Sequence, residues 1–141
     1  MKNNKQKILF ICTHNSVRSQ MAEGMINSFY KDRFEAYSAG TEPTEVSPYA
    51  VEVMSEIGIG ISKQSSKSIE EFRTEKIDYA VTVCDHANET CPFFPGGAEH
   101  IHKGFKDPSK LSGNEAFLRS EFREIRDNIR KWLEEKFGRK F

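Results

Sequence analysis

Residues 7–12, KILFIC, form the segment that most restricts how this chain can fold. Every residue after Lys7 in this segment is apolar. A continuous apolar run of this length is typical of a strand buried on both faces, and such strands occur mainly in parallel sheets. Apolar residues then recur at helical spacing between residues 19 and 30. The N-terminal part of the chain therefore predicts a strand, a short polar loop and a helix.

The same alternation continues along the chain. Further strands are expected at residues 34–40, 78–84 and 99–105, and helices at 48–57, 68–72 and after residue 112. Ser47 before Pro48 suits the start of a helix, and Ser112 with Glu115 has the capping-box spacing. Because strands that alternate with helices form parallel sheets, we predict an α/β fold: a four-stranded parallel sheet with helices on both faces, as one domain over residues 1–141.

The charge balance restricts the class of partner. Lysine and arginine number 21, as do aspartate and glutamate, so no net charge favours nucleic acid or an anionic membrane. No apolar run approaches the roughly 20 residues that span a bilayer, and the start MKNNKQK lacks the apolar core of a signal peptide. We therefore expect a cytoplasmic protein with no nucleic-acid or membrane partner. Its small size and neutral charge fit a monomer.

The chain has three cysteines, Cys12, Cys84 and Cys91. Thiols in the cytosol are kept reduced, and an odd number does not suit a framework of structural disulfides. The cysteines are therefore candidates for packing, metal-binding or catalytic roles. Cys84 and Cys91, taken with the chain's later histidines, do not have the spacing of a common zinc site, so no metal is expected. Those histidines are His86, His100 and His102.

Cys12 stands where the first strand is expected to end, and Arg18 follows after five residues. Backbone N–H groups of such a loop can point inward, and the helix behind it adds the positive end of its dipole. Arg18 can bind two oxygens of a tetrahedral anion, and the same field favours the thiolate of Cys12. We therefore predict an oxyanion-binding loop with Cys12 as the nucleophile. The predicted loop comprises Thr13, His14, Asn15, Ser16, Val17, Arg18 and Ser19.

Two loop residues have predicted supporting roles. Ser19 can hydrogen-bond the Cys12 thiolate, and Asn15 can hold the loop in shape. The alternative is that Cys12 is a small core residue, which is the usual role of a lone cysteine at a strand end.

The loop sequence CTHNSVRSQMAEG resembles the active-site loop of the thioredoxin-coupled arsenate reductases, which share the fold of the low-molecular-weight protein tyrosine phosphatases. The segments YSAG, GIGIS, VTVCDHANETCP and GFKDP follow in the order of that family, so the resemblance covers nearly the whole chain. It implies that the substrate is arsenate, with phosphate or sulfate as analogues. It also implies that thioredoxin is the electron donor and that no cofactor is needed.

The resemblance also implies roles for Cys84 and Cys91 in a thiol relay. Cys12 attacks arsenate, Cys84 attacks Cys12 and releases arsenite, and Cys91 then attacks Cys84. Asp107, in the segment KDP, matches the family's general acid. The alternatives are that Cys84 and Cys91 are inert packing residues and that Asp107 only forms a turn before proline.

Two loop positions depart from the family pattern. Val17 replaces a second loop cysteine that many relatives have, and His14 replaces a frequent glycine. Ser109 stands where phosphatases of this fold usually have a tyrosine, which points away from a phosphotyrosine substrate.

Some reductases of this family bind a monovalent cation beside the loop. Asn15, Glu23 and Ser38 match part of that site, but Lys67 stands where the family has an aspartate. We expect the Lys67 ammonium to take the place of the cation and to pair with Glu23, so that potassium is not required.

Two other functions are compatible with these residues. A low-molecular-weight protein tyrosine phosphatase would hydrolyse phosphate monoesters through a phosphocysteine, and would need Cys12, Arg18 and Asp107 but neither Cys84 nor Cys91. A non-catalytic module would bind an anion or oxidise reversibly, and would not need an acid at position 107.

Overall fold

The computed structural model describes residues 5–85, 94–97 and 99–138 of the chain. The strands are β1 (Gln6–Cys12), β2 (Phe34–Gly40), β3 (Tyr79–Thr82) and β4 (Glu99–His102). The α-helices are α1 (Arg18–Phe29), α2 (Pro48–Ser55) and α3 (Glu115–Phe137), and the 3₁₀ helices are η1 (Ile69–Phe72) and η2 (Pro108–Lys110). No helix in the described ranges is both long enough and apolar enough to cross a membrane.

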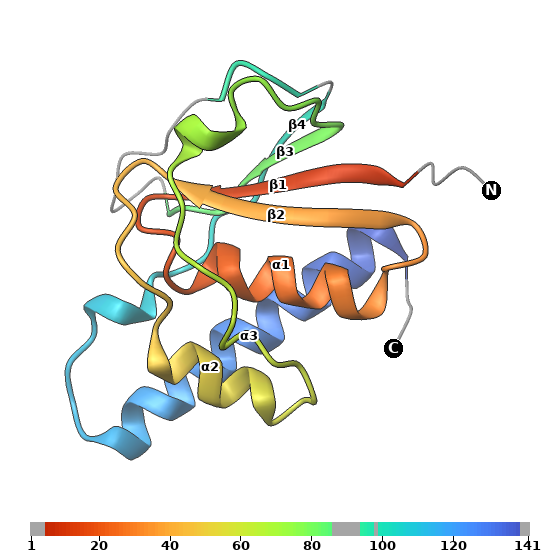
Figure 1. Cartoon of the computed structure of the whole chain (residues 1–141). Helices are drawn as coiled ribbons and strands as arrows, with labels where there is room; N and C mark the ends of the chain where they lie inside the picture. The colour runs from red at the N-terminus through yellow and green to blue at the C-terminus, as the bar shows by residue number, and fades with distance from the viewer. Residues whose placement is uncertain (1–4, 86–93, 98, 139–141) are drawn as a thin grey trace.

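The four strands form one parallel sheet in the order β2-β1-β3-β4 (Figure 1). The chain leaves β1 toward β2 on one side and later returns to β3 on the other side. The strand order therefore reverses between β1 and β3, and ligands of such sheets bind beyond the carboxyl ends of the strands at that point. Cys12 is the last residue of β1. This arrangement confirms the predicted four-stranded parallel sheet.

Strand β1 is the centre of the core because both of its faces are covered. Ile8, Phe10 and Cys12 pack in a cluster with residues of α1, α2 and α3. Leu9 and Ile11 pack on the opposite face, in a cluster that includes Ile69 and Phe72 of η1. Residues 8–12 are at most 1% exposed. The continuous apolar run therefore forms a strand that is buried on both faces, as its sequence predicts.

The helices cover the two faces unequally. All three α-helices contribute to the cluster on one face, and Figure 1 shows them together below the sheet. Within the described ranges, the opposite face is covered by η1 and by the side chains of Ile77 and Phe94. The expectation of helices on both faces therefore holds with α-helices on one side and a 3₁₀ helix on the other.

Some predicted boundaries and caps are wrong. Strands β3 and β4 end at Thr82 and His102, short of the predicted residues 84 and 105. Helix α3 is capped by Asn114, whose side chain accepts a hydrogen bond from the N–H of Phe117, and not by Ser112. Gly113, with φ of 149°, separates Ser112 from the helix, so a capping box from that residue cannot form. Pro48 does open α2, but Ser47 makes no side-chain cap.

Candidate active site

The loop of residues 13–17 joins β1 to α1 at the point where the strand order reverses. Its carbonyl groups are bound from outside. The carbonyl of Thr13 accepts from the N–H of Glu42 at 2.9 Å, and the carbonyl of Ser16 accepts from the N–H of Ser47 at 3.1 Å. Since these carbonyls face the segment that follows β2, the loop does not present them to a bound anion. An anion site requires that N–H groups, and not carbonyl oxygens, face the ligand.

Asn15 gives the loop its shape. It is the only non-glycine residue with positive φ in the described part of the chain, at 52°, and asparagine tolerates this conformation better than most residues. The turn directs the N–H of Asn15 to the Cys12 Sγ atom at 3.2 Å. The Asn15 side chain donates to the Oγ atom of Ser19 at 2.8 Å and accepts from the N–H of Lys67 at 2.7 Å. Asn15 thus links the end of β1, the start of α1 and Lys67.

The hydroxyl of Ser19 lies beside the cysteine. The Oγ atom of Ser19 lies 2.9 Å from the Cys12 Sγ atom. Because the same Oγ accepts from the side-chain amide of Asn15, its own O–H is free to donate to the sulfur. The sulfur is therefore positioned to accept two hydrogen bonds, as a thiolate does. Cys12 is 1% exposed and has a free thiol.

Arg18 and Asp107 meet at the same end of the sheet. The Nη2 atom of Arg18 lies 3.5 Å from the Oδ2 atom of Asp107, with side chains that are 3% and 8% exposed. The Nη1 atom of Arg18 donates to the carbonyl of Phe105 at 3.2 Å. The other carboxylate oxygen of Asp107 accepts from the N–H of Ser109 at 3.0 Å and from its Oγ at 2.6 Å. Two residues that are 89 positions apart in the sequence are thus brought together.

Glu23 and Lys67 form a second polar cluster behind the loop. The Lys67 Nζ atom lies 3.9 Å from the Glu23 Oε1 atom, and the hydroxyl of Ser38 donates to the same carboxylate. Burial raises the pKa of Glu23 above its ordinary value, against the opposing effects of Ser38 and Lys67. The expected pairing of Lys67 with Glu23 is therefore present.

Cys84 follows β3 closely. The N–H of Val83 donates to the carbonyl of Ile11 in β1 at 2.9 Å. Cys84, the next residue, therefore lies close to the end of β1. Cys84 is fully buried and disulfide-bonded, whereas Cys12 is free. Cys91 and His86 lie outside the described residues.

The described histidines are engaged by nearby oxygens. A ring nitrogen of His14 lies 3.1 Å from the carbonyl of Glu42. His100 Nε2 lies 2.6 Å from the carbonyl of Gly96, and His102 Nδ1 lies 2.8 Å from Thr82 Oγ1. Over the described ranges, no three side chains of metal-binding type are grouped.

Gln20 is a site residue that the sequence analysis missed. Its side-chain amide donates to the carbonyl of Asn15 at 3.0 Å and to the carbonyl of Ser65 at 2.9 Å. Gln64 donates to the Gln20 side-chain oxygen at 2.7 Å. Gln20 is fully buried, although its position on a helix after the loop gives no local sign of this. It ties the loop to the segment that precedes η1.

Comparison with known families shows what this chain is similar to. The family model described as low molecular weight phosphotyrosine protein phosphatase matches residues 7–140. An arsenate reductase from Halalkalibacterium halodurans is 46% identical over 128 residues, covering 91% of this chain and 92% of the relative. An arsenate reductase from Bacillus subtilis is 41% identical over 128 residues, with the same two coverages.

Solved structures agree with the sequence relatives. A structure of an arsenate reductase in the reduced state superposes with a TM-score of 0.75 at 30% identity, covering 92% of this chain and 95% of that one. The thioredoxin-dependent arsenate reductase of Corynebacterium glutamicum gives 0.65 at 26% identity, covering 99% and 66%. The low molecular weight protein tyrosine phosphatase of T. tengcongensis gives 0.68 at 27% identity, covering 93% and 99%.

Proposed function

This chain belongs to the low molecular weight phosphotyrosine protein phosphatase family, and we propose that it is an arsenate reductase that takes its electrons from thioredoxin. The observation that carries the proposal is the state of its cysteines. Cys12 is a free thiol that accepts hydrogen bonds inside an oxyanion loop, while Cys84, near the end of the neighbouring strand, is disulfide-bonded. A phosphatase of this fold needs only the first of these two features.

Arsenate binds first, in the loop of residues 13–19. The inward N–H groups of the loop and the guanidinium of Arg18 hold the tetrahedral oxyanion, and the start of α1 adds its positive dipole end. The Arg18 side chain is held by the carbonyl of Phe105 and by Asp107, so it need not be ordered when the anion arrives.

Cys12 then attacks arsenic as a thiolate. A sulfur–arsenic bond forms and an arsenic–oxygen bond breaks. Asp107 supplies a proton to the departing oxygen, which leaves as water. The two hydrogen bonds to the sulfur from Ser19 and from the N–H of Asn15 keep the thiolate in place before the attack.

Reduction follows when the Cys84 thiolate attacks the Cys12 sulfur. The sulfur–arsenic bond breaks, its electron pair passes to arsenic, and arsenic leaves in the trivalent state as arsenite. A disulfide between Cys12 and Cys84 is left behind. The Cys91 thiolate then attacks the Cys84 sulfur, which frees Cys12 as a thiolate and forms a disulfide between Cys84 and Cys91. The dithiol of thioredoxin reduces this disulfide by the same exchange.

The cysteines in the structure are consistent with the end of this series of reaction steps. A disulfide at Cys84 combined with a free thiol at Cys12 is the state that the relay reaches after its last internal step. A disulfide that included Cys12 would instead leave no thiolate for the attack on arsenate.

The test is a coupled assay in which arsenate, thioredoxin, thioredoxin reductase and NADPH are present and NADPH oxidation is followed. The wild type should turn over, and Cys84→Ser and Cys91→Ser should each stop turnover. Asp107→Asn should lower kcat by about 100-fold or more, the usual contribution of a general acid. Asp127→Asn, a substitution on the exposed side of α3, is the matched control and should retain full activity.

Phosphatase activity is the second candidate, and the family match favours it. It predicts hydrolysis of p-nitrophenyl phosphate with equal rates in the wild type, Cys84→Ser and Cys91→Ser, and no arsenate-dependent NADPH oxidation. That combined result would overturn the reductase proposal. Ser109 argues against phosphotyrosine as a substrate, because it offers no aromatic ring to flank the substrate ring.

The Lys67 ammonium replaces a monovalent cation in this proposal. It lies 3.9 Å from the Glu23 carboxylate and donates to the carbonyl of Ser65 at 2.6 Å. A positive charge is thus already present beside Asn15 and the loop. Activity should be equal in potassium and sodium buffers of the same ionic strength, and a several-fold stimulation by potassium would contradict this role.

A further inference from the structure

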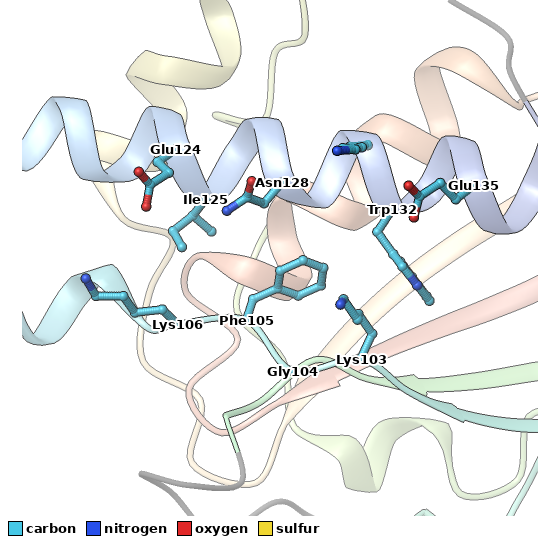
Figure 2. Close-up of a pocket in the computed structure, with 10 residues that line it drawn as sticks. Lys103, Gly104, Phe105, Lys106, Glu124, Ile125, Asn128, Trp132 and Glu135 are labelled. Atoms are coloured by element: carbon cyan, nitrogen blue, oxygen red, sulfur yellow. The ribbon is translucent and has the colours of Figure 1, made fainter.

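A groove lies behind the arginine of the site, between the segment 103–106 and helix α3. Its volume is about 380 Å³, within the range of small-molecule sites. Figure 2 shows the loop residues along one wall and the residues of α3 along the other. It is lined by Lys103, Gly104, Phe105, Lys106, Glu124, Ile125, Asn128, Lys131, Trp132 and Glu135. The steps proposed for arsenate reduction do not use it.

The floor of the groove is aromatic and apolar. Phe105 is 6% exposed and Ile125 is 3% exposed. The rings of Phe105 and Trp132 are 6.3 Å apart between centroids and stand edge to face. The Lys103 ammonium lies 5.9 Å from the centroid of the Phe105 ring. A flat ring entering the groove would therefore meet two aromatic surfaces at an angle, which is the geometry that aromatic groups prefer.

The walls carry charges of both signs. Lys106 is paired with Glu121 at 3.1 Å. Among the residues that the structure describes, the other charged groups of the lining form no ion pair within 4 Å. These groups are Lys103, Lys131, Glu124 and Glu135. Since two cations and two carboxylates are available, the groove suits a ligand that carries one charge of each sign better than a simple anion or cation.

The loop wall of the groove is also part of the active-site framework. The carbonyl of Phe105 accepts from Arg18, and the N–H of Phe105 donates to the carbonyl of Val83 at 3.2 Å. Gly104 is also close to Cys84, the residue after Val83: an added Cβ at position 104 would lie 3.1 Å from the carbonyl oxygen of Cys84. A ligand that restrains this wall therefore acts on the groups that hold Arg18 and Cys84.

We propose that the groove binds a small aromatic zwitterion, of the chemical class of the free aromatic amino acids, and that its binding is coupled to oxyanion binding in the loop. The ring lies against Phe105 and Trp132. The carboxylate faces Lys103 on the loop wall, and the ammonium faces Glu135 on the helix wall. The coupling passes through the Phe105 backbone to Arg18.

Trp132 makes the proposal directly measurable, because it is the only tryptophan in the chain. L-Phenylalanine is titrated into the protein while the fluorescence of Trp132 is followed with tryptophan-selective excitation. A saturable change is expected. 3-Phenylpropanoate lacks the ammonium and 2-phenylethylamine lacks the carboxylate, so each should bind several-fold more weakly. No saturable change, or equal affinity for all three probes, would overturn the zwitterion site.

Two variants locate the site. Lys103→Gln and Glu135→Gln should each weaken the binding of phenylalanine several-fold. Lys136→Gln changes a lysine on the same helix that does not line the groove, and it should leave the affinity unchanged. All three residues are exposed, so the variants should fold. Affinity that is unchanged in both groove variants would place the probe elsewhere and overturn the assignment.

The coupling is tested by adding inorganic phosphate. If phosphate in the loop and phenylalanine in the groove are linked, saturating phosphate must change the dissociation constant of phenylalanine, and phenylalanine must change that of phosphate by the same factor. Identical constants with and without phosphate would overturn the coupling. None of these measurements depends on arsenate turnover, so their failure is distinguishable from a failure of the proposed reductase activity.

Discussion

At the scale of single residues, Ser19 decides how the nucleophile is held. Its oxygen accepts a hydrogen bond from the Asn15 side chain and lies 2.9 Å from the Cys12 sulfur. A serine on the first turn of a helix would ordinarily face solvent or bond to the preceding turn. Here it is fully buried, so its hydroxyl has no water to replace the sulfur as a partner.

Ser19→Ala should therefore slow the attack of Cys12. Loss of one hydrogen bond to a charged acceptor costs about 1.5 kcal/mol, or about tenfold in rate. The expected result is about a tenfold lower kcat/KM for arsenate, and a similar loss in the rate at which iodoacetamide alkylates Cys12 in a Cys84→Ser, Cys91→Ser background. Ser120→Ala, on the exposed surface of α3, is the control. An unchanged alkylation rate in Ser19→Ala would show that the hydroxyl does not stabilise the thiolate.

At the scale of elements, the start of α3 shows how a side chain two residues from the expected one takes over the cap. Asn114 accepts from the N–H of Phe117 at 2.8 Å, while Ser112 lies before the glycine turn at Gly113.

Asn114→Ala should lower stability by about 1 kcal/mol. This corresponds to roughly 3 °C in Tm for a domain of this size. Ser112→Ala is the matched control and should change Tm by less than 1 °C, roughly the effect of a surface substitution; equal losses in both variants would restore the capping-box prediction.

The contact between α1, β2 and the segment before η1 contains a largely buried carboxylate, that of Glu23. Burial raises the pKa of Glu23 above its ordinary value, although the hydroxyl of Ser38 and the ammonium of Lys67 partly oppose this. A raised folded-state pKa means that ionised Glu23 costs stability near neutral pH. That cost decreases as pH falls through the folded-state pKa, because the folded protein then takes up a proton before the unfolded chain does.

Glu23→Gln removes this titration. The Tm of the wild type minus the Tm of Glu23→Gln should therefore increase as pH is lowered from 7 to 5, whatever its sign at pH 7. Thermal unfolding monitored by circular dichroism at several pH values gives this difference. Glu45→Gln, at an exposed position after β2, should show no such trend. A difference that decreases toward pH 5 would mean that pairing with Lys67 outweighs burial.

At the scale of the whole molecule, the sheet order brings three distant segments to one point. Gly40 ends β2, pairs with Cys12 at the end of β1, and donates its N–H to the carbonyl of Lys67 at 2.9 Å. There is no room for a side chain among these segments. A Cβ at position 40 would lie 2.4 Å from the carbonyl oxygen of Thr13 and 3.0 Å from the nitrogen of Asn15.

Gly40→Ala should therefore displace the loop backbone, because backbone atoms cannot move aside as a flexible side chain can. Overpacking of this kind costs about 1–3 kcal/mol. We expect a lower Tm and a loss of phosphate affinity, measured by calorimetric titration. Gly60→Ala is the matched control, since an added Cβ there meets nothing within 4 Å. Phosphate affinity equal to that of the wild type in Gly40→Ala would show that the loop tolerates displacement.

Local sequence determined much of this protein. The apolar run before Cys12 specifies a strand buried on both faces, the spacing from Cys12 to Arg18 specifies the loop, and the helical periodicity after residue 115 specifies α3. Each of these patterns acts between neighbouring residues, so it can be recognised without the rest of the chain. The parallel sheet follows from their alternation, because parallel strands need crossover connections.

Tertiary structure alone decided the contacts that complete the site. The Phe105 carbonyl that holds Arg18, the Lys67 N–H that holds Asn15 and the Gln20 side chain that ties the loop to Ser65 join segments far apart in sequence. All three contacts use a backbone group of one partner, and such groups do not depend on residue type, so the sequence gives no signal for them. Which residues make these contacts depends on the strand order β2-β1-β3-β4 and on where each strand ends. Packing over the whole sheet sets both the order and the strand ends.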